Sequence, residues 1–167
     1  MEISKNKENQ KNNENIQFEE LLKCFNQPEN TFLCNKCKEQ TTMYSNISKL
    51  PFYLCFHLKR FNYDIQKGEI EKIHSFIDFP ELLNIYAYVD KEKSFSFEWN
   101  TQKKDCEYEL FAVNEHSGGI NGGHYYVHLD FQGKWYCIND PKVSEDNKYK
   151  SEDSLVLFYQ RKFCFVD

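Results

Sequence analysis

Residues 117–140 read SGGINGGHYYVHLDFQGKWYCIND, and this stretch decides how the chain is interpreted. Four of the six glycines of the chain lie in its first seven residues, directly before His124. Glycine has no Cβ and tolerates positive φ, so a backbone built from it can approach a ligand closely. Histidine exchanges protons near neutral pH. We therefore expect His124 to open a strand behind a flexible glycine loop, at the edge of a cleft.

Two strand-like runs follow the histidine, at residues 125–131 and 134–138. The Gln-Gly pair between them favours a hairpin turn. An antiparallel hairpin brings its open ends together, so His124 and Asn139 are expected to be neighbours. One ring nitrogen of the histidine would face a nucleophile, and the other would donate to Asn139 or Asp140. The alternative is a plain hairpin with an exposed histidine at its end, followed by an ordinary turn.

The rest of the chain carries mostly strand signals. A short amphipathic helix is expected over residues 18–25, with Pro28 and Asn30 ending it. Further strands are expected at residues 44–49, 52–58, 73–79, 108–113 and 155–163. Residues 52–58 are almost entirely apolar, which predicts a strand buried on both faces, whereas residues 86–97 fit either strands or a covering loop. The predicted fold class is α+β and β-dominated, with a mostly antiparallel sheet.

Composition limits the class of protein. The 167 residues, 40% of them hydrophobic, suffice for one domain. Residues 1–17 are polar and predict a solvated tail before a domain at residues 18–167. The net charge of -5, without a basic run or an apolar run of about 20 residues, argues against nucleic acid and membrane partners. The N-terminus lacks an apolar signal core, so we expect an intracellular protein, cytoplasmic or nuclear.

Three segments resemble the ubiquitin-specific protease family of cysteine deubiquitinases. Residues 108–118 (YELFAVNEHSG), 122–125 (GGHY) and 135–140 (WYCIND), with Val143, are similar to the family's His box. Residues 50–61 read LPFYLCFHLKRF and resemble its Leu-Pro…His-Leu-Lys-Arg-Phe segment. Residues 157–161 read LFYQR and resemble its closing strand. The segments occur in family order, and the resemblance runs from about Phe18 to Lys162.

The resemblance implies the palm sheet of a papain-like cysteine protease fold, with part of a fingers subdomain and without the thumb. It implies that His124 is the general base of a thiol-dependent deubiquitinase. Asn139 matches the third position of the catalytic triad, and Asp140 matches an acidic residue that assists it. His116 also matches a family position, and we interpret it as loop structure rather than as an acid or base.

The same resemblance implies the substrate. Gly122, Gly123 and Tyr125 would contact the thin C-terminal Gly-Gly tail of ubiquitin, and the partners would be ubiquitin and ubiquitinated proteins. Catalysis in this family needs no cofactor.

Cys34 and Cys37 have the two-residue spacing of a zinc knuckle. The resemblance implies a fingers subdomain that binds structural zinc through two such pairs, and the chain carries one pair. A closed zinc site needs four ligands. The nearest other thiols, Cys24 and Cys55, are expected to lie in the core, so a zinc site in this chain would be incomplete.

The family's nucleophilic cysteine box does not occur in the sequence. Cys106 is the thiol that the pattern predicts to be least buried, but its surroundings lack the helix N-terminus and oxyanion setting of a thiolate nucleophile. Cys137 is expected to pack against the sheet. The chain would therefore be either a fragment of a longer enzyme or a catalytically silent relative.

Three functions remain open from the sequence. The first is half of a deubiquitinase that hydrolyses the bond after the C-terminal glycine of ubiquitin. The second is a non-catalytic ubiquitin-binding or scaffold module. The third, an unrelated zinc-ribbon β protein, depends on Cys34 and Cys37 alone.

Overall fold

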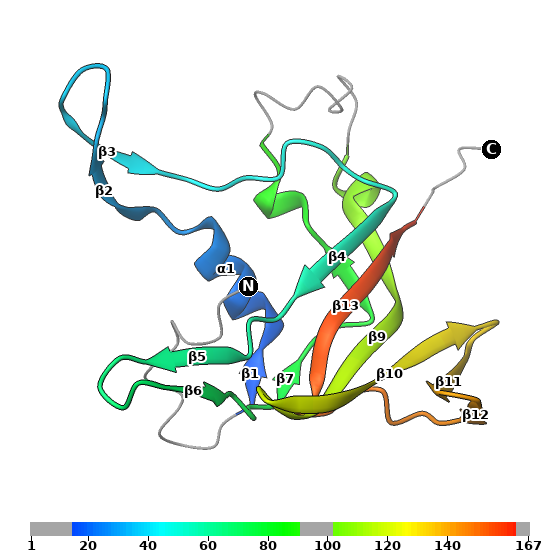
Figure 1. Cartoon of the computed structure of the whole chain (residues 1–167). Helices are drawn as coiled ribbons and strands as arrows, with labels where there is room; N and C mark the ends of the chain where they lie inside the picture. Colours follow the sequence, from blue (N-terminus) through cyan, green and yellow to red (C-terminus); the bar gives the residue numbers. More distant parts are fainter. Residues whose placement is uncertain (1–14, 91–101, 163–167) are drawn as a thin grey trace.

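The computed structural model describes residues 15–90 and 102–162, in which one seven-stranded sheet is the dominant feature (Figure 1). The sheet order is β12-β11-β10-β9-β13-β4, and β8 pairs with β9 off this path. Its strands are β4 (Tyr53–His57), β8 (Leu82–Asn84), β9 (Glu107–Gly119), β10 (Gly122–Phe131), β11 (Lys134–Asn139), β12 (Lys142–Glu145) and β13 (Ser154–Arg161). All six pairings in it are antiparallel, which confirms the predicted β-dominated α+β class.

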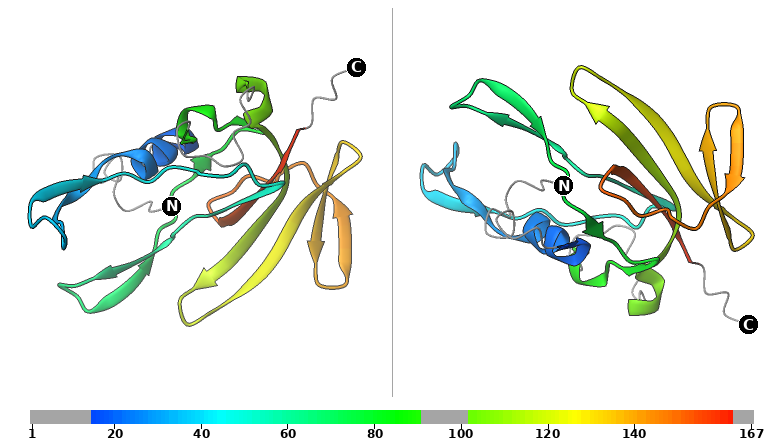
Figure 2. Two further views of the ribbon diagram at one scale, coloured as in Figure 1. Left: turned by 90° about the horizontal axis from the view of Figure 1, so that it is seen from above. Right: turned by 90° about the horizontal axis from the view of Figure 1, so that it is seen from below.

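The predicted helix is present as α1 (Phe18–Asn26). Phe18, Leu21 and Leu22 are buried because the i, i+3, i+4 spacing places them on one face. Phe18 packs edge-on against Phe56 of β4, with 5.1 Å between ring centroids, and stacks near Tyr159 of β13. Helix α1 therefore covers one face of the sheet, as the views in Figure 2 show.

Smaller elements surround the sheet. Two hairpins project from it in Figure 1, formed by β2 (Glu29–Leu33) with β3 (Gln40–Met43) and by β5 (Phe61–Asp64) with β6 (Glu69–Lys72). The short strands β1 (Ile16–Gln17) and β7 (Ile77–Asp78) pair in parallel. Two 3-10 helices, η3 (Tyr86–Tyr88) and η4 (Lys103–Cys106), complete the secondary structure of the described residues.

Arg60 ties three segments together from a fully buried position. Its Nε donates to the Ser154 carbonyl at 2.5 Å, and one terminal nitrogen donates to the carbonyls of Ile73 and Ser75 at 3.0 and 2.8 Å. Burial lowers the pKa of Arg60 to about 10, so the group still carries its charge at neutral pH. Because an unpaired buried charge is costly, these bonds fix the chain after β4 against the start of β13.

Three strand predictions were wrong in detail. Residues 44–49 form only an isolated bridge, Ile47 with Val89. Residues 53–57 form β4, but the strand is half-buried on one face only, and Tyr53 on the other face is 59% exposed. Residues 73–79 contain only β7, because Arg60 binds the carbonyls of the preceding segment.

The structure also bears on the other predicted strands and on the predicted polar tail. The strands expected at 108–113, 125–131, 134–138 and 155–163 are present in β9, β10, β11 and β13, with residue 163 outside the described residues. Ile16, assigned to the polar tail from sequence, is buried in the core, whereas residues 1–14 and the uncertain residues 91–97 lie outside the description. Within the described residues, no helix is long and apolar enough to cross a membrane.

We expect Phe18→Ala to lower the free energy of unfolding by about 3–5 kcal/mol, because it leaves a cavity between α1 and the sheet. Phe25→Ala is the matched control on the same helix. Its ring is 43% exposed, so the expected loss is below about 1 kcal/mol. Urea denaturation followed by tryptophan fluorescence measures both, and equal losses would contradict the packing described for Phe18.

Candidate active site

The β9–β10 hairpin carries the histidine. The strands pair from Leu129 with Ala112 to Gly122 with Gly119, and only Ile120 and Asn121 lie between them. The expected flexible glycine loop is therefore wrong, because the four glycines form the paired ends of two strands. His124 is the third residue of β10 rather than its first, and it lies opposite Ser117.

Contacts in this hairpin require glycine at two positions. A Cβ on Gly123 would lie 2.2 Å from Nε2 of His116 and 2.4 Å from the Ser117 carbonyl oxygen. Gly118 has φ +110, and a Cβ there would lie 2.7 Å from the Gly122 carbonyl oxygen. His116 is buried in β9 rather than in a loop, and its ring lies 4.6 Å from that of Tyr125. The contacts of His116, Gly118 and Gly123 thus fix how closely β9 and β10 approach each other.

The β10–β11 turn brings His124 and Asn139 together. Gln132 and Gly133 have φ 56 and 76, the left-handed values that a tight type I′ hairpin requires, so the predicted turn is confirmed. Nε2 of His124 lies 2.6 Å from Oδ1 of Asn139, the last residue of β11. The same nitrogen lies 3.7 Å from Oδ2 of Asp140. The neighbour relation expected from the sequence is present.

This arrangement determines where a proton sits on the neutral ring. Both oxygens near Nε2 of His124 can accept a hydrogen bond, and neither can donate one. The neutral imidazole therefore carries its proton on Nε2, which leaves the Nδ1 lone pair available as a base. The Asp140 carboxylate places a negative charge beside the ring. The His124 and Asp140 side chains are 49% and 69% exposed, so reactants can approach.

A buried acidic cluster lies beside this pair, and sequence reasoning missed it. Glu115 is 1% exposed and accepts from the hydroxyls of Ser151 and Ser154 at 2.6 and 3.1 Å. Its Oε2 lies 3.4 Å from Nε2 of buried His128. Burial by itself raises the pKa of Glu115, but interactions with His128, Ser151 and Tyr126 outweigh it and hold that pKa below the ordinary value. A glutamate within the apolar run of β9 was the signal that could have revealed the cluster.

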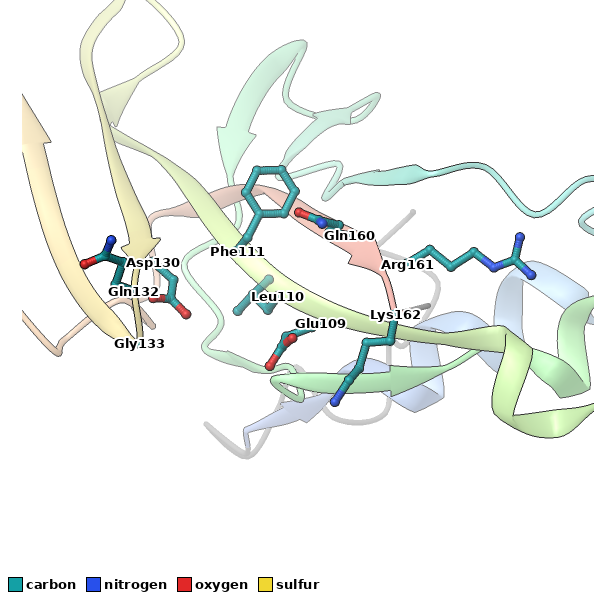
Figure 3. Close-up of a pocket in the computed structure, with 9 residues that line it drawn as sticks. All are labelled: Glu109, Leu110, Phe111, Asp130, Gln132, Gly133, Gln160, Arg161 and Lys162. Atoms are coloured by element: carbon teal, nitrogen blue, oxygen red, sulfur yellow. The ribbon is translucent and has the colours of Figure 1, made fainter. Parts of the chain in front are cut away.

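Among the hollows formed by the described residues, two bear on the position of the site. One, of about 630 Å³, adjoins the hairpin and is lined by His74, Ser117, Gly118, Gly119, Ser151, Glu152 and Asp153. Gly122 and Gly123 stand in the strand opposite this lining, and the Tyr125 side chain is 59% exposed. The other, of about 450 Å³, lies at the far end of β10, near Asp130 and Gly133 (Figure 3). The first is lined by Ser117, which pairs with His124 across the hairpin.

The described cysteines do not supply a nucleophile at His124. Cys106 is fully buried, so the expectation that it is the least buried thiol was wrong. Cys137 is half-buried, as expected for a packed thiol, and lies opposite His128 in the register. Burial raises the pKa of Cys137, which disfavours its thiolate. Cys55, expected in the core, is exposed on β4. Cys164 lies outside the described residues.

Cys34 and Cys37 lie in the turn between β2 and β3. The Cys34 amide donates to the Glu39 carbonyl at 2.9 Å, and the Lys38 amide donates back to the Cys34 carbonyl at 2.8 Å. Hydrogen bonds from the backbone of Cys37 and Lys36 hold the pKa of the Cys34 thiol below its ordinary value, which favours its thiolate. Among residues 15–90 and 102–162, no group of three or more metal-binding side chains occurs. The turn thus fits half of a four-ligand site.

Comparison with known proteins identifies the family. The sequence model described as "Ubiquitin carboxyl-terminal hydrolase" matches residues 1–159. The chain is 38% identical over 141 residues to "Ubiquitin carboxyl-terminal hydrolase 10" of Arabidopsis thaliana, and 34% identical over 143 residues to "Ubiquitin carboxyl-terminal hydrolase 15" of Homo sapiens. These alignments cover 80% and 82% of this chain and 14% of each relative.

A solved structure matches the fold of this chain. "Structure of the SAGA Ubp8/Sgf11/Sus1/Sgf73 DUB module bound to ubiquitin aldehyde" contains a chain that matches with a TM-score of 0.71 and 27% identity. The match covers 89% of this chain and 34% of that one. The strand-dominated antiparallel sheet of this chain matches the fold of that structure. The chain belongs to the ubiquitin carboxyl-terminal hydrolase family of cysteine deubiquitinases. It corresponds to part of the length of these relatives.

We expect Gly123→Ala to destabilise the chain by about 1–3 kcal/mol, because the new methyl group collides with His116 and the Ser117 carbonyl. Gly119→Ala is the matched control in the same hairpin, since a Cβ there meets nothing within 4 Å. Thermal unfolding followed by circular dichroism compares the two. Equal stability of both variants would show that the His116 contact does not constrain the hairpin.

Proposed function

We propose that this chain supplies the general base and its orienting groups in a deubiquitinase that cleaves the bond after the C-terminal glycine of ubiquitin. The observation that carries the proposal is the 2.6 Å contact between His124 and Asn139 in a chain of this family. The domain proposed for this role spans residues 18–167, to which Ile16 and Gln17 of β1 are added.

In the proposed reaction, Nδ1 of His124 takes the proton from a cysteine thiol. The thiolate attacks the carbonyl carbon of the terminal glycine and forms a thioester, and the imidazolium returns its proton to the departing amine. Water activated by the same histidine then hydrolyses the thioester, which releases ubiquitin and restores the thiol. Asn139 holds the ring by a neutral hydrogen bond, and Asp140 stabilises its positive charge.

The thiol is proposed to come from outside the described residues, because the described cysteines near the site are buried or half-buried. The curated relatives are several times longer than the region they share with this chain. We therefore propose that a cysteine-bearing segment, on the same longer protein or on a second chain, completes the site beside His124.

Ubiquitin is the proposed partner. The solved relative is described as bound to ubiquitin aldehyde, a ubiquitin with a reactive C-terminus. The hollow beside the hairpin is bordered by Gly118 and Gly119, where a side-chain-free wall suits the thin tail of ubiquitin. Gly122, Gly123 and the exposed ring of Tyr125 are proposed to contact that tail from β10.

A non-catalytic ubiquitin-binding module is the second candidate. It is favoured by one observation, the lack of an exposed thiol close to His124 among the described residues. This candidate predicts that ubiquitin still binds, but that a supplied cysteine half produces no turnover.

Cys34 and Cys37 are proposed to be two of four ligands of a structural zinc ion. Zinc at this turn would hold the β2–β3 hairpin against another ligand pair, and it would take no part in the chemistry at His124.

The catalytic proposal is tested with this chain joined to the cysteine-bearing N-terminal half of a family member. His124→Ala is expected to lower kcat for a fluorogenic C-terminal ubiquitin substrate by about 10²–10⁴-fold, because the thiol loses its base. Asn139→Ala should lower kcat less, because the base remains but is poorly oriented. Lys148→Ala, on the segment between β12 and β13, is the control and should change neither kcat nor KM. A wild-type fusion that is folded and inactive would reject the catalytic proposal in favour of the binding module.

The zinc proposal is tested in the same fusion. Native mass spectrometry is expected to find one zinc ion in the wild type and none in Cys34→Ser, because three ligands hold a structural zinc weakly. Cys55→Ser, which removes an exposed thiol elsewhere, is the control and should keep the zinc. Retention of the metal in Cys34→Ser would contradict the assignment.

A further inference from the structure

Tyr126 occupies a central position on the face of the sheet that carries the histidine. Alternate residues of a strand point to the same face, so Tyr126 shares its face of β10 with His124 and His128. Tyr126 lies directly opposite Glu115 of β9. On the other side, the β10–β11 register pairs Val127 with Ile138, and continuing it by one position places Asn139 opposite Tyr126. Tyr126 thus lies between the buried carboxylate and the His–Asn pair.

The Tyr126 ring contacts both histidines of this face. It is stacked with the His124 ring, with 6.5 Å between centroids and 20° between planes. It meets His128 at 5.8 Å and 65°. The ring therefore forms a wall beside the imidazole, and an aromatic face also attracts an imidazolium.

Tyr126 and Glu115 are paired directly across β9 and β10, and burial together with hydrogen bonding to that carboxylate raises the pKa of the Tyr126 hydroxyl. Glu115 cannot easily move. It is buried, it accepts hydrogen bonds from Ser151 and Ser154, and it faces His128. Breaking such a set leaves a charge without partners in the interior, which is costly. Glu115 therefore offers Tyr126 a buried and well-connected anchor.

His124 needs such a support. Its polar partners, Asn139 and Asp140, lie at the surface, and the Asp140 side chain is 69% exposed. Exposed pairs of this kind constrain a side chain weakly, because water competes for both groups. The tyrosine ring is the contact that links the imidazole to the buried part of the sheet.

We propose that Tyr126, anchored by Glu115, is a positioning residue that holds the His124 ring in contact with Asn139. Its importance for catalysis rests on the proposed function, whereas its effect on the His124 ring does not. The proposal assigns a role to the buried Glu115 cluster, which the reaction itself does not use.

The test begins with the 167-residue chain alone, by nuclear Overhauser contacts between the ring protons of His124 and the side-chain amide of Asn139. These contacts are expected to be strong in the wild type and to be lost in Tyr126→Phe and in Glu115→Gln, because each removes one end of the anchor. Tyr136→Phe is the matched control, since it deletes a hydroxyl on the opposite face of β11 and should leave the contacts unchanged.

A double variant and a control for folding complete the test. The double variant should lose no more contact intensity than either single variant, because both changes break the same link. Chemical shifts of Trp135 and of core methyl groups report folding, and if Glu115→Gln unfolds, the milder Tyr126→Phe decides. Unchanged His124–Asn139 contacts in a folded Tyr126→Phe chain would overturn the proposal.

Activity separates this proposal from the proposed function. In the fusion that carries a cysteine half, Tyr126→Phe should lower kcat by about 10- to 100-fold while KM for the ubiquitin substrate is unchanged, as expected for a misplaced base. An inactive wild-type fusion would reject the proposed function and leave the result of the nuclear Overhauser measurement in force. An active fusion in which Tyr126→Phe keeps the wild-type kcat would overturn the positioning role in catalysis.

Discussion

The register of strands β9, β10 and β11 is the constraint on which the candidate site depends. A slip of one residue would turn His124 to the other face of the sheet, away from Asn139 and Glu115. Two features oppose such a slip. The His116 ring fits only against a glycine at position 123, and the turn at Gln132 and Gly133 fixes the pairing of β10 with β11.

Hydrogen bonds elsewhere in the sheet also stabilise that register. Tyr159 of β13 and Tyr108 of β9 are fully buried and donate to the carbonyls of Pro80 and Pro51 at 2.6 and 2.7 Å, which joins the strands to the surrounding loops. Lys72 donates to the His116 carbonyl and pairs with Asp153 at 2.7 Å. The hairpin that carries His124 is therefore attached to elements distant in sequence, so its geometry does not depend on local strand preferences alone.

Local patterns predicted the elements that depend on local chemistry. The apolar spacing at Phe18, Leu21 and Leu22 predicted α1, and the Gln132–Gly133 turn predicted the neighbour relation of His124 and Asn139. Predictions failed where the local structure or the burial of a residue depends on residues elsewhere in the chain. The glycines next to His124 looked like a loop because glycine is usually read as flexible, whereas the partner ring that requires Gly123 belongs to β9. Glu115 lies in the apolar run of β9, but the partners that allow its burial, Ser151 and Ser154, become evident only in the folded structure.

The proposed function requires the C-terminus of ubiquitin to lie beside the β9–β10 hairpin, within reach of His124. Photo-crosslinking tests it most directly, with a ubiquitin that carries a diazirine at its last residue and the fusion whose nucleophile is replaced by alanine. Mass spectrometry is expected to map the crosslinks to residues 117–125. Crosslinks confined to the far end of β10, around Asp130 and Gly133, would contradict it.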